Sequence, residues 1–343
     1  MDLADAIEQS VGIYSSAPTG YLSALARVPG FTLADLDEAI AARSLIRART
    51  MRYSVYTLPP DLLALAVAAT RTLATRTNPF RRRLAGDYLR LAAEVEQALA
   101  AGPLAATEIR RIVDPNKQLG NLFSILLGLM GAESRIVRAT NLGGWRSNRL
   151  TYARWEDWVP GPAPAELDSE TAQMVLAERY AAAYGPVTEA DLRWWTGWSA
   201  SESKAAAAGV DLSQQGNASD LLDGVRLLPV WDVLMVAYRD RSRLFPDALG
   251  PWYYDRLGNA TSVVYDRGSI VGVWDLGKSD SPLAVKVAPT VKWSKRRWSE
   301  VEEQVQRIGA VIGSSDVSLQ RVTEPVDLTT AKRNTFLAPL ATM

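Results

Sequence analysis

The chain has 343 residues, of which 48% are hydrophobic and 22% are charged, as in ordinary globular proteins of two or three domains. Equal numbers of basic and acidic side chains give a net charge of zero, and the absence of cysteine and histidine excludes disulfides, thiol nucleophiles, Ser-His-Asp triads and Cys/His zinc sites. The sequence has no apolar run long enough to span a membrane and no signal-peptide pattern at its start. We therefore expect a cytoplasmic protein without membrane contact.

The first part of the chain shows the pattern of a winged helix, in which two helices precede a β-hairpin. Apolar residues recur at helical spacing in the first elements, and alternation with a period of two follows from residue 46. Thr32 and Asp35 have the spacing of a capping box at the start of the second helix of the pair. The predicted elements are a short helix, the helix pair and two strands, at residues 2–9, 21–28, 32–42, 46–53 and 55–58.

The same order of elements recurs further along the chain. After an alanine-rich helical stretch at 60–101, we predict two helices and two strands at residues 107–112, 119–130, 135–139 and 149–152. A helix at 169–184 then leads into two short helices at 185–209, where Gly197 suits a left-handed turn. Two capping-box pairs support these two helices, namely Thr188 with Asp191 and Ser199 with Glu202.

Beyond Gly224 the pattern is dominated by short strands, with one helix at 298–312. We predict strands at residues 225–231, 234–237, 261–265, 269–274 and 284–288. The predicted fold class is α+β, with three tandem winged-helix units followed by a small antiparallel β-barrel-like domain. The predicted boundaries are 2–95, 96–160 and 168–222 for the winged helices, 223–315 for the β-rich domain and 316–343 for a tail.

Charge is unevenly distributed along the chain. Residues 43–83 carry nine arginines and one acid, including the run Arg81–Arg83, and residues 135–154 carry five arginines and no acid. Residues 156–191 carry eight acids and one arginine. Such segments can combine into one basic face that binds nucleic acid, or they can intermix on folding as solvated surface charge.

Five segments resemble one protein family, the AlkZ-like (YcaQ) winged-helix DNA glycosylases. Residues 18–30 (PTGYLSALARVPG) resemble the segment that follows the family's active-site strand, and residues 51–56 (MRYSVY) resemble its "M-R-G-T-L-H" strand. Residues 185–195 (GPVTEADLRWW) resemble its third winged helix, and residues 227–242 (LLPVWDVLMVAYRDRS) resemble its most recognisable stretch. Residues 271–274 (VGVW) resemble its "V-x-G-x-W" strand. The resemblance extends over roughly residues 2–310.

This resemblance implies hydrolysis of the N-glycosidic bond of alkylated bases, including interstrand crosslinks, in double-stranded DNA. It implies a concave basic surface formed by tandem winged helices, no cofactor and no metal, and we expect a monomer. Arginines on that surface would contact DNA phosphates, and Asp240 would orient two of them. Surface or internal ion pairs are the alternative for the same residues. The candidate DNA-binding residues are Arg52, Arg146, Arg149, Arg239 and Arg241.

The family's catalytic motif, Gln-x-Gln or Gln-x-Asp, is replaced here by Tyr14-Ser15-Ser16, and the histidine of its "T-L-H" strand by Tyr56. Tyr14, Ser16 and Tyr56 are therefore candidate pocket residues, with ordinary packing as the alternative. A serine can hold water but is not an effective base near neutral pH. We expect weak or absent base excision.

Two other carboxylates, Asp232 and Glu8, could supply a general base in place of the missing motif. For Asp232, helix capping is the alternative role. Three tryptophans of the third unit, Trp194, Trp195 and Trp198, are predicted to pack in the core rather than to stack on bases. Two alternative functions stay open: an active glycosylase that uses residues outside the family motif, and a winged-helix transcriptional regulator or interaction protein.

Overall fold

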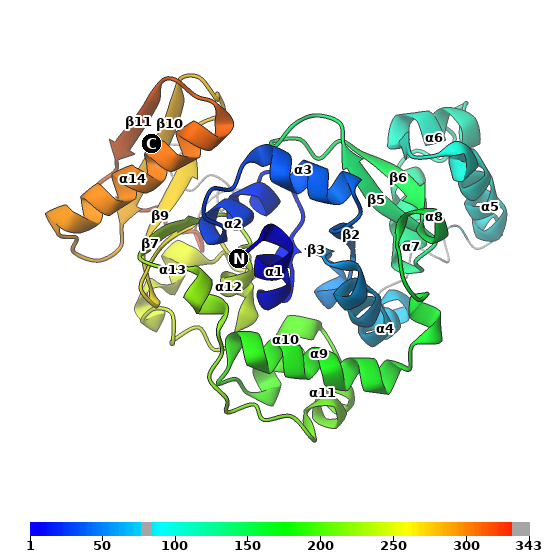
Figure 1. The fold of residues 1–343 in the computed structure, drawn as a ribbon, viewed down its shortest axis with the longest axis horizontal. Coiled ribbons are helices and arrows are strands. Elements are labelled where there is room, and N and C mark those ends of the chain that lie inside the picture. The colour runs from blue at the N-terminus through cyan, green and yellow to red at the C-terminus, as the bar shows by residue number, and fades with distance from the viewer. Residues whose placement is uncertain (77–83, 85, 331–343) are drawn as a thin grey trace.

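A computed structural model of the protein describes residues 1–76, 84 and 86–330. The predicted run Arg81–Arg83 lies outside these residues. The six-stranded sheet lies between α3 and the group α5–α7 in Figure 1, α9–α11 lie below it, and β7–β11 with α14 form the lobe at the left. Among the described residues, no helix is both long and apolar enough to span a membrane.

The first unit has the predicted order of helices and hairpin. Its elements are α1 (Leu3–Gln9), β1 (Ile13–Tyr14), α2 (Thr19–Arg27), α3 (Leu33–Ala41), β2 (Ile46–Arg49) and β3 (Val55–Leu58). The capping box of Thr32 and Asp35 is present. The first strand is shorter than predicted, because Arg52 and Tyr53 adopt positive φ angles of 52° and 60° and form a tight turn. Alternation in sequence does not reveal such a turn.

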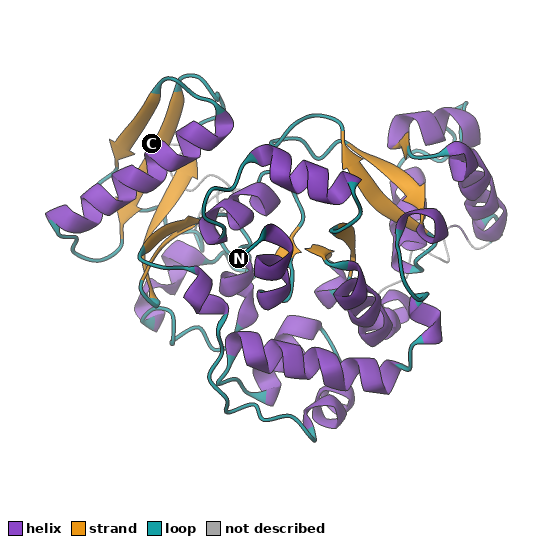
Figure 2. Ribbon diagram, in the orientation of Figure 1, coloured by secondary structure: helices purple, strands orange, loops and turns teal. Residues whose placement is uncertain are grey.

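The second unit repeats this order and shares its sheet with the first. It follows α4 (Pro60–Arg76) and α5 (Tyr88–Ala98). Its elements are β4 (Leu104–Ala105), α6 (Ala106–Val113), α7 (Leu122–Ala132), β5 (Ile136–Asn141), β6 (Leu150–Arg154) and the short α8 (Trp155–Trp158). The two hairpins join edge to edge through Arg47 and Arg138, which gives the strand order β1-β3-β2-β5-β6-β4. In Figure 2 the strands are orange, with purple helices around them. The two units therefore share one sheet.

The third unit is a helix-turn-helix without a wing. Its helices are α9 (Ser169–Tyr184), α10 (Glu189–Thr196) and α11 (Ala200–Ala207), and both predicted capping boxes form around a left-handed Gly197. Residues 208–224 contain no strand, so the predicted third hairpin is wrong. This polar and glycine-containing segment instead bonds back to the α9–α10 junction, where the amide of Gly216 donates to the carbonyl of Gly185 (2.7 Å).

The C-terminal part forms an open five-stranded sheet rather than a barrel. Its elements are β7 (Val225–Leu228), α12 (Val233–Ala237), α13 (Gly250–Tyr253), β8 (Val263–Asp266), β9 (Ser269–Leu276), β10 (Leu283–Pro289), α14 (Lys295–Ile312) and β11 (Val317–Arg321). The order β11-β10-β9-β8-β7 leaves both edges unjoined, and β10 and β11 are parallel.

Two further predictions for this part are wrong. The apolar run at 234–237 is the helix α12, because Asp232 caps it by accepting a hydrogen bond from the amide of Leu234 (3.1 Å). Residues 317–321, predicted to belong to a tail, pair with β10 as β11. This pairing is brought about by α14, which returns the chain to the sheet edge.

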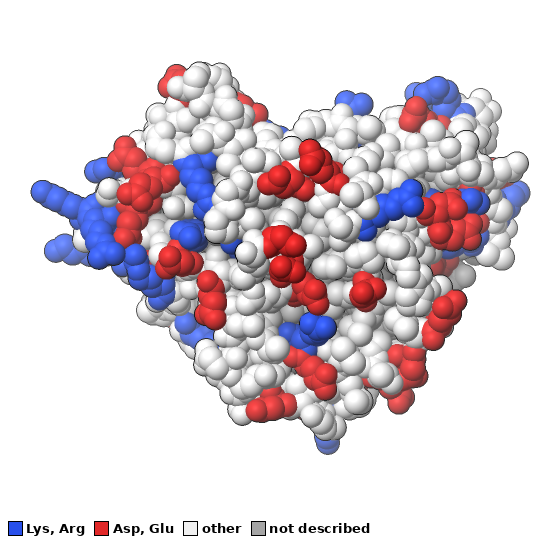
Figure 3. Space-filling view, in the orientation of Figure 1, with Lys and Arg blue, Asp and Glu red and all other residues white. Residues whose placement is uncertain are grey.

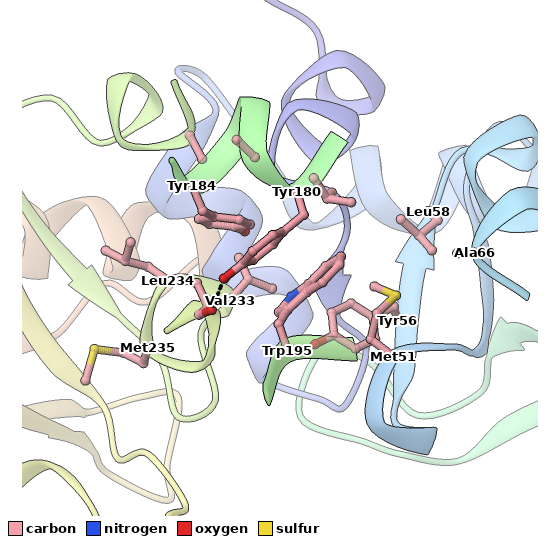
Figure 4. Close-up of a cluster of buried hydrophobic side chains, with 14 of the residues drawn as sticks. Met51, Tyr56, Leu58, Ala66, Tyr180, Tyr184, Trp195, Val233, Leu234 and Met235 are labelled. Atoms are coloured by element: carbon pink, nitrogen blue, oxygen red, sulfur yellow. Dashed lines mark hydrogen bonds between the residues drawn. The ribbon is translucent and has the colours of Figure 1, made fainter. Parts of the chain in front are cut away.

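Aromatic side chains of α9 and α10 connect the third unit to the rest of the protein (Figure 4). Trp195 stacks on Tyr180 with 4.7 Å between ring centroids, and the Tyr180 hydroxyl donates to the carbonyl of Ala237 (2.6 Å). The Tyr184 hydroxyl donates to the carbonyl of Ser10 (2.7 Å). Trp195 and Trp198 are both buried, which confirms the prediction that they pack in the core.

Asp275 of β9 is a buried carboxylate that should destabilise the fold at neutral pH. Burial raises its pKa to about 6, although it accepts a hydrogen bond from the amide of Leu276 and faces Lys286. A raised pKa means that ionisation is more costly in the folded protein than in the unfolded chain. Asp275→Asn should therefore increase the free energy of unfolding at pH 7 by about 1–3 kcal/mol.

This gain should decline as the pH falls from about 6 to about 4, because the folded carboxyl is then protonated and the unfolded one is becoming so. Urea denaturation at pH 7 and at pH 4 measures the difference. Equal gains at both pH values would show that the ionised carboxylate is not the cause.

Candidate functional site

The candidate catalytic positions 14 and 16 do not share a strand face. Strand β1 contains only Ile13 and Tyr14, and Tyr14 pairs with Tyr56 of β3. After the amide of Ser15 donates to the carbonyl of Val55 (2.9 Å), the chain turns, and Ser16 lies in the turn that leads into α2. Tyr14 and Ser16 are therefore not alternate residues of one strand, and their side chains need not point to the same side.

Tyr14 lies in an aromatic cluster. Its ring centroid is 6.0 Å from that of Tyr56 and 5.4 Å from that of Trp231. Tyr56 is buried, which raises the pKa of its hydroxyl, whereas Tyr14 and Trp231 are half-buried. Trp231 was not predicted as a site residue. The sequence feature that could have indicated a role for Trp231 is its place in residues 227–242, which resemble the family. Its position beside Tyr14 depends on tertiary packing.

The polar groups in the turn after Tyr14 are two serine hydroxyls. Those of Ser15 and Ser16 are buried and have no hydrogen-bond partner among the described residues. The turn is connected to the second hairpin, because the amide of Ala17 donates to the side-chain carbonyl of Asn148 (2.8 Å). The aromatic wall and these hydroxyls can contact a base or a water molecule, but neither hydroxyl is an effective general base.

Neither alternative carboxylate is suited to replace the missing motif. Asp232 has no exposed surface and forms two charge-assisted hydrogen bonds with Arg27, at 2.7 and 2.8 Å. It also accepts from the hydroxyl of Ser23 (2.8 Å) and caps α12, so its lone pairs are used structurally. Glu8 forms a surface ion pair with Arg179 (3.1 Å).

Two of the predicted DNA-binding arginines lie against one tryptophan. The Arg52 guanidinium is 4.1 Å from the ring centroid of Trp194, and that of Arg241 is 5.4 Å from the same ring and 3.5 Å from Tyr254. Trp194 is only half-buried, so its predicted role in core packing alone is incomplete. We call Arg52, Trp194, Arg241 and Tyr254 the arginine–tryptophan cluster.

No carboxylate balances this cluster within the described chain. Neither Arg52 nor Arg241 forms an ion pair there, and the pKa of Arg241 is lowered by burial and by the positive charge of Arg52. The cluster joins two units, because Arg52 is in the turn of the first hairpin and Trp194 is in α10. Two adjacent cations without a counter-charge form a surface that attracts phosphate.

The other predicted arginines are placed differently. Arg239 is exposed, and Asp240 accepts from the amide of Ser242 (3.0 Å), so the predicted orientation of both arginines by Asp240 is not seen. Arg146 forms an ion pair with Asp280 (2.6 Å), which offsets its charge. Arg149 is exposed on the same hairpin. The structure therefore brings Arg52 and Arg241 together, whereas Arg146 and Arg149 belong to the separate hairpin of β5 and β6.

Acidic and basic side chains are interspersed on the face shown in Figure 3. The largest group of basic side chains on this face lies over the left end of α14. A basic surface of the predicted kind is not present on this face.

Helix-turn-helix pairs on a shared sheet, with two arginines that have no carboxylate partner among the described residues, are typical of proteins that bind polyanions such as nucleic acids. The family model "DNA glycosylase AlkZ-like" matches residues 8–311, and the chain belongs to this family. The solved structure of the Streptomyces sahachiroi DNA glycosylase AlkZ is similar in fold, with a TM-score of 0.71, 19% sequence identity and coverage of 94% of each chain. Comparison with curated proteins gives no match.

Proposed function

We propose that this protein binds double-stranded DNA that contains an alkylated or crosslinked base, and that it does so as a monomer. The observation that carries this proposal is the arginine–tryptophan cluster, whose two cations have no carboxylate partner in the described chain. Guanidinium groups bind phosphate through paired charge-assisted hydrogen bonds. The family membership supports DNA as the polyanion.

The proposal includes slow or absent excision of the bound base. Hydrolysis of the N-glycosidic bond needs a water held beside a cationic sugar, and Tyr14 and Ser16 offer neither an amide nor a carboxylate for this purpose. The alternative is an active glycosylase that uses other residues. The buried ion pair of Asp232 and the surface ion pair of Glu8 argue against these two as its base. The helix-turn-helix units would also suit a transcriptional regulator, but the family membership favours a protein that binds damaged DNA.

The double change Arg52→Ala, Arg241→Ala should weaken duplex binding and reduce its salt dependence. Each lost phosphate contact lowers the slope of log affinity against log salt concentration by about one unit, so we expect a decrease of about two. Fluorescence anisotropy with a labelled duplex over a series of salt concentrations measures the slope.

Arg90→Ala is the matched control, because Arg90 is an exposed arginine of α5 whose charge is already paired with Asp87 and Glu94. It should leave the slope unchanged. A wild-type protein that does not bind duplex at low salt, or a double variant with the wild-type slope, would refute the proposal.

A further inference from the structure

A cavity lies on the side of the six-stranded sheet opposite to the Tyr14 side chain. It has a volume of about 430 Å³ and is lined by residues of α6, α7 and strands β2, β3, β5 and β6. Tyr14 pairs with Tyr56, which in turn pairs with Ala48, so these three side chains point to one face. Arg47 and Arg49 flank Ala48 in β2 and point to the opposite face, as does Arg138, the partner of Arg47. We call this the arginine cavity.

The arginine cavity contains more positive charge than its surroundings balance. Four arginines line it, and no carboxylate does so among the described residues. One of the four, Arg110, is paired with Asp114 (3.3 Å). The other three, Arg47, Arg49 and Arg138, form no ion pair in the part of the chain that the structure describes.

The hydrogen bonds of these arginines do not neutralise their charge. Arg47 is only 3% exposed, and it donates to the carbonyl of Ala139 (3.3 Å) while its Nε has no partner. Arg49 donates to the carbonyl of Tyr53 (2.8 Å), and its guanidinium lies over the ring of Tyr53. Backbone carbonyls satisfy donors but carry no net charge, so the cavity remains cationic.

The arginines of the cavity repel one another, which indicates that the cavity lacks a negative charge. Arg47 and Arg138 face each other directly across β2 and β5, an arrangement that destabilises a sheet when the charges are alike. The pKa of Arg49 is lowered by burial and by Arg138, and no carboxylate acts against this shift. Burial and the charge of Arg138 also lower the pKa of Arg47, whereas Tyr21 and Asp37 raise it and so reduce the shift. A bound anion would relieve both effects.

The walls of the cavity indicate that the anion carries an organic group. Phe123, Leu127, Ile136 and Val55 form an apolar lining, and Tyr152 adds an aromatic ring with a hydroxyl. The volume falls in the range typical of small-molecule sites and exceeds what inorganic phosphate alone would fill. Arginines combined with aromatic and apolar walls suit a phosphate attached to a base or a sugar.

We propose that the arginine cavity binds the phosphate group of a nucleotide, with Arg49 and Arg138 as its main ligands and the apolar wall against the base or sugar. The site is separate from the arginine–tryptophan cluster and does not depend on the function proposed above. The same chemistry occurs in a free nucleotide and in a DNA strand, and the experiment distinguishes these two sources.

Isothermal titration calorimetry with dGMP at low salt tests the proposal, with inorganic phosphate and deoxyguanosine as partial ligands. We expect saturable binding of dGMP that is at least about tenfold tighter than that of either partial ligand, since phosphate and nucleoside both contribute contacts. Arg49→Met and Arg138→Met should each weaken dGMP binding by about tenfold or more, because each removes a charged hydrogen-bond donor.

Thermal unfolding separates a ligand site from a structural role. Arg138→Met should raise the melting temperature of the unliganded protein by relieving repulsion with Arg47, and it should lose the stabilisation that dGMP gives the wild type. Arg111→Met is the matched control, because Arg111 is an exposed neighbour of Arg110 on α6 that does not line the cavity. It should bind dGMP as the wild type does.

Absence of saturable dGMP binding, or equal binding by the wild type and both cavity variants, would overturn the proposal.

Competition by duplex DNA identifies the source of the phosphate. Displacement of dGMP, together with weaker duplex binding by Arg138→Met, assigns the site to a DNA strand. Duplex binding without displacement assigns it to a free nucleotide. The double change Arg52→Ala, Arg241→Ala should leave dGMP affinity unchanged. The proposal for the arginine cavity can therefore fail without affecting the proposal for the arginine–tryptophan cluster, and the reverse.

Discussion

Asp232→Asn should lower the free energy of unfolding by about 3–5 kcal/mol, because it leaves the buried guanidinium of Arg27 without its counter-charge. The two side chains are 3% and 0% exposed and meet at 2.7 Å. Their elements are far apart in sequence, since Arg27 ends α2 and Asp232 precedes α12. The pair therefore connects the first unit to the C-terminal part of the protein. Urea denaturation at neutral pH measures the loss.

Two variants make this prediction specific. Arg27→Met combined with Asp232→Asn should recover much of the loss, because no unpaired charge then stays buried and Asn can still accept from the amide of Leu234. Glu8→Gln breaks the exposed pair with Arg179 and should cost less than about 1 kcal/mol. A loss from Asp232→Asn no larger than that from Glu8→Gln would contradict the account.

The double change Tyr14→Gln, Ser16→Gln should accelerate base excision by about a hundredfold, which is the typical effect of a positioning contact. In the wild type, the Tyr14 ring packs against Tyr56 and Trp231 and offers no amide or carboxylate to hold a water molecule. The Ser16 hydroxyl is short and lies in the turn beyond β1. A glutamine amide in place of the Tyr14 ring would supply a hydrogen bond to the attacking water, and the change at position 16 restores the second residue of the family's Gln-x-Gln motif.

Single-turnover release from an N7-alkylguanine duplex measures this effect, since departure of this labile base needs little help. Tyr14→Phe is the control, because it keeps the ring and should not increase the rate. If the wild type releases the base as fast as the double variant or faster, residues 14 and 16 are not the positions that hold water. The catalytic group would then have to be sought elsewhere in the chain.

Local hydrogen bonding explains why the helical parts of the fold could be predicted from sequence. A capping box involves residues three apart, so the pairs Thr188 with Asp191 and Ser199 with Glu202 fold as their spacing predicts. Gly197 adopts φ of 81°, as a glycine between two capped helices should. These features require no knowledge of the rest of the chain.

Elements whose conformation depends on distant partners were not predictable in this way. The run at 234–237 is short and apolar, and such runs do not distinguish a strand from a buried helix by periodicity. Strand β11 forms only because α14 brings it beside β10, and the third hairpin is replaced by loop contacts with α9.

For the candidate sites, the sequence by itself determined the residue types: a tyrosine and a serine where the family has amides or a carboxylate, and arginines in the hairpins. Only the tertiary structure decided which of them act together. It placed Trp231 beside Tyr14, paired Arg146 with Asp280 and left Arg52 and Arg241 without a carboxylate partner in the part of the chain that it describes. The physical reason is that charge compensation and ring packing depend on distance in space, whereas sequence shows only separation along the chain.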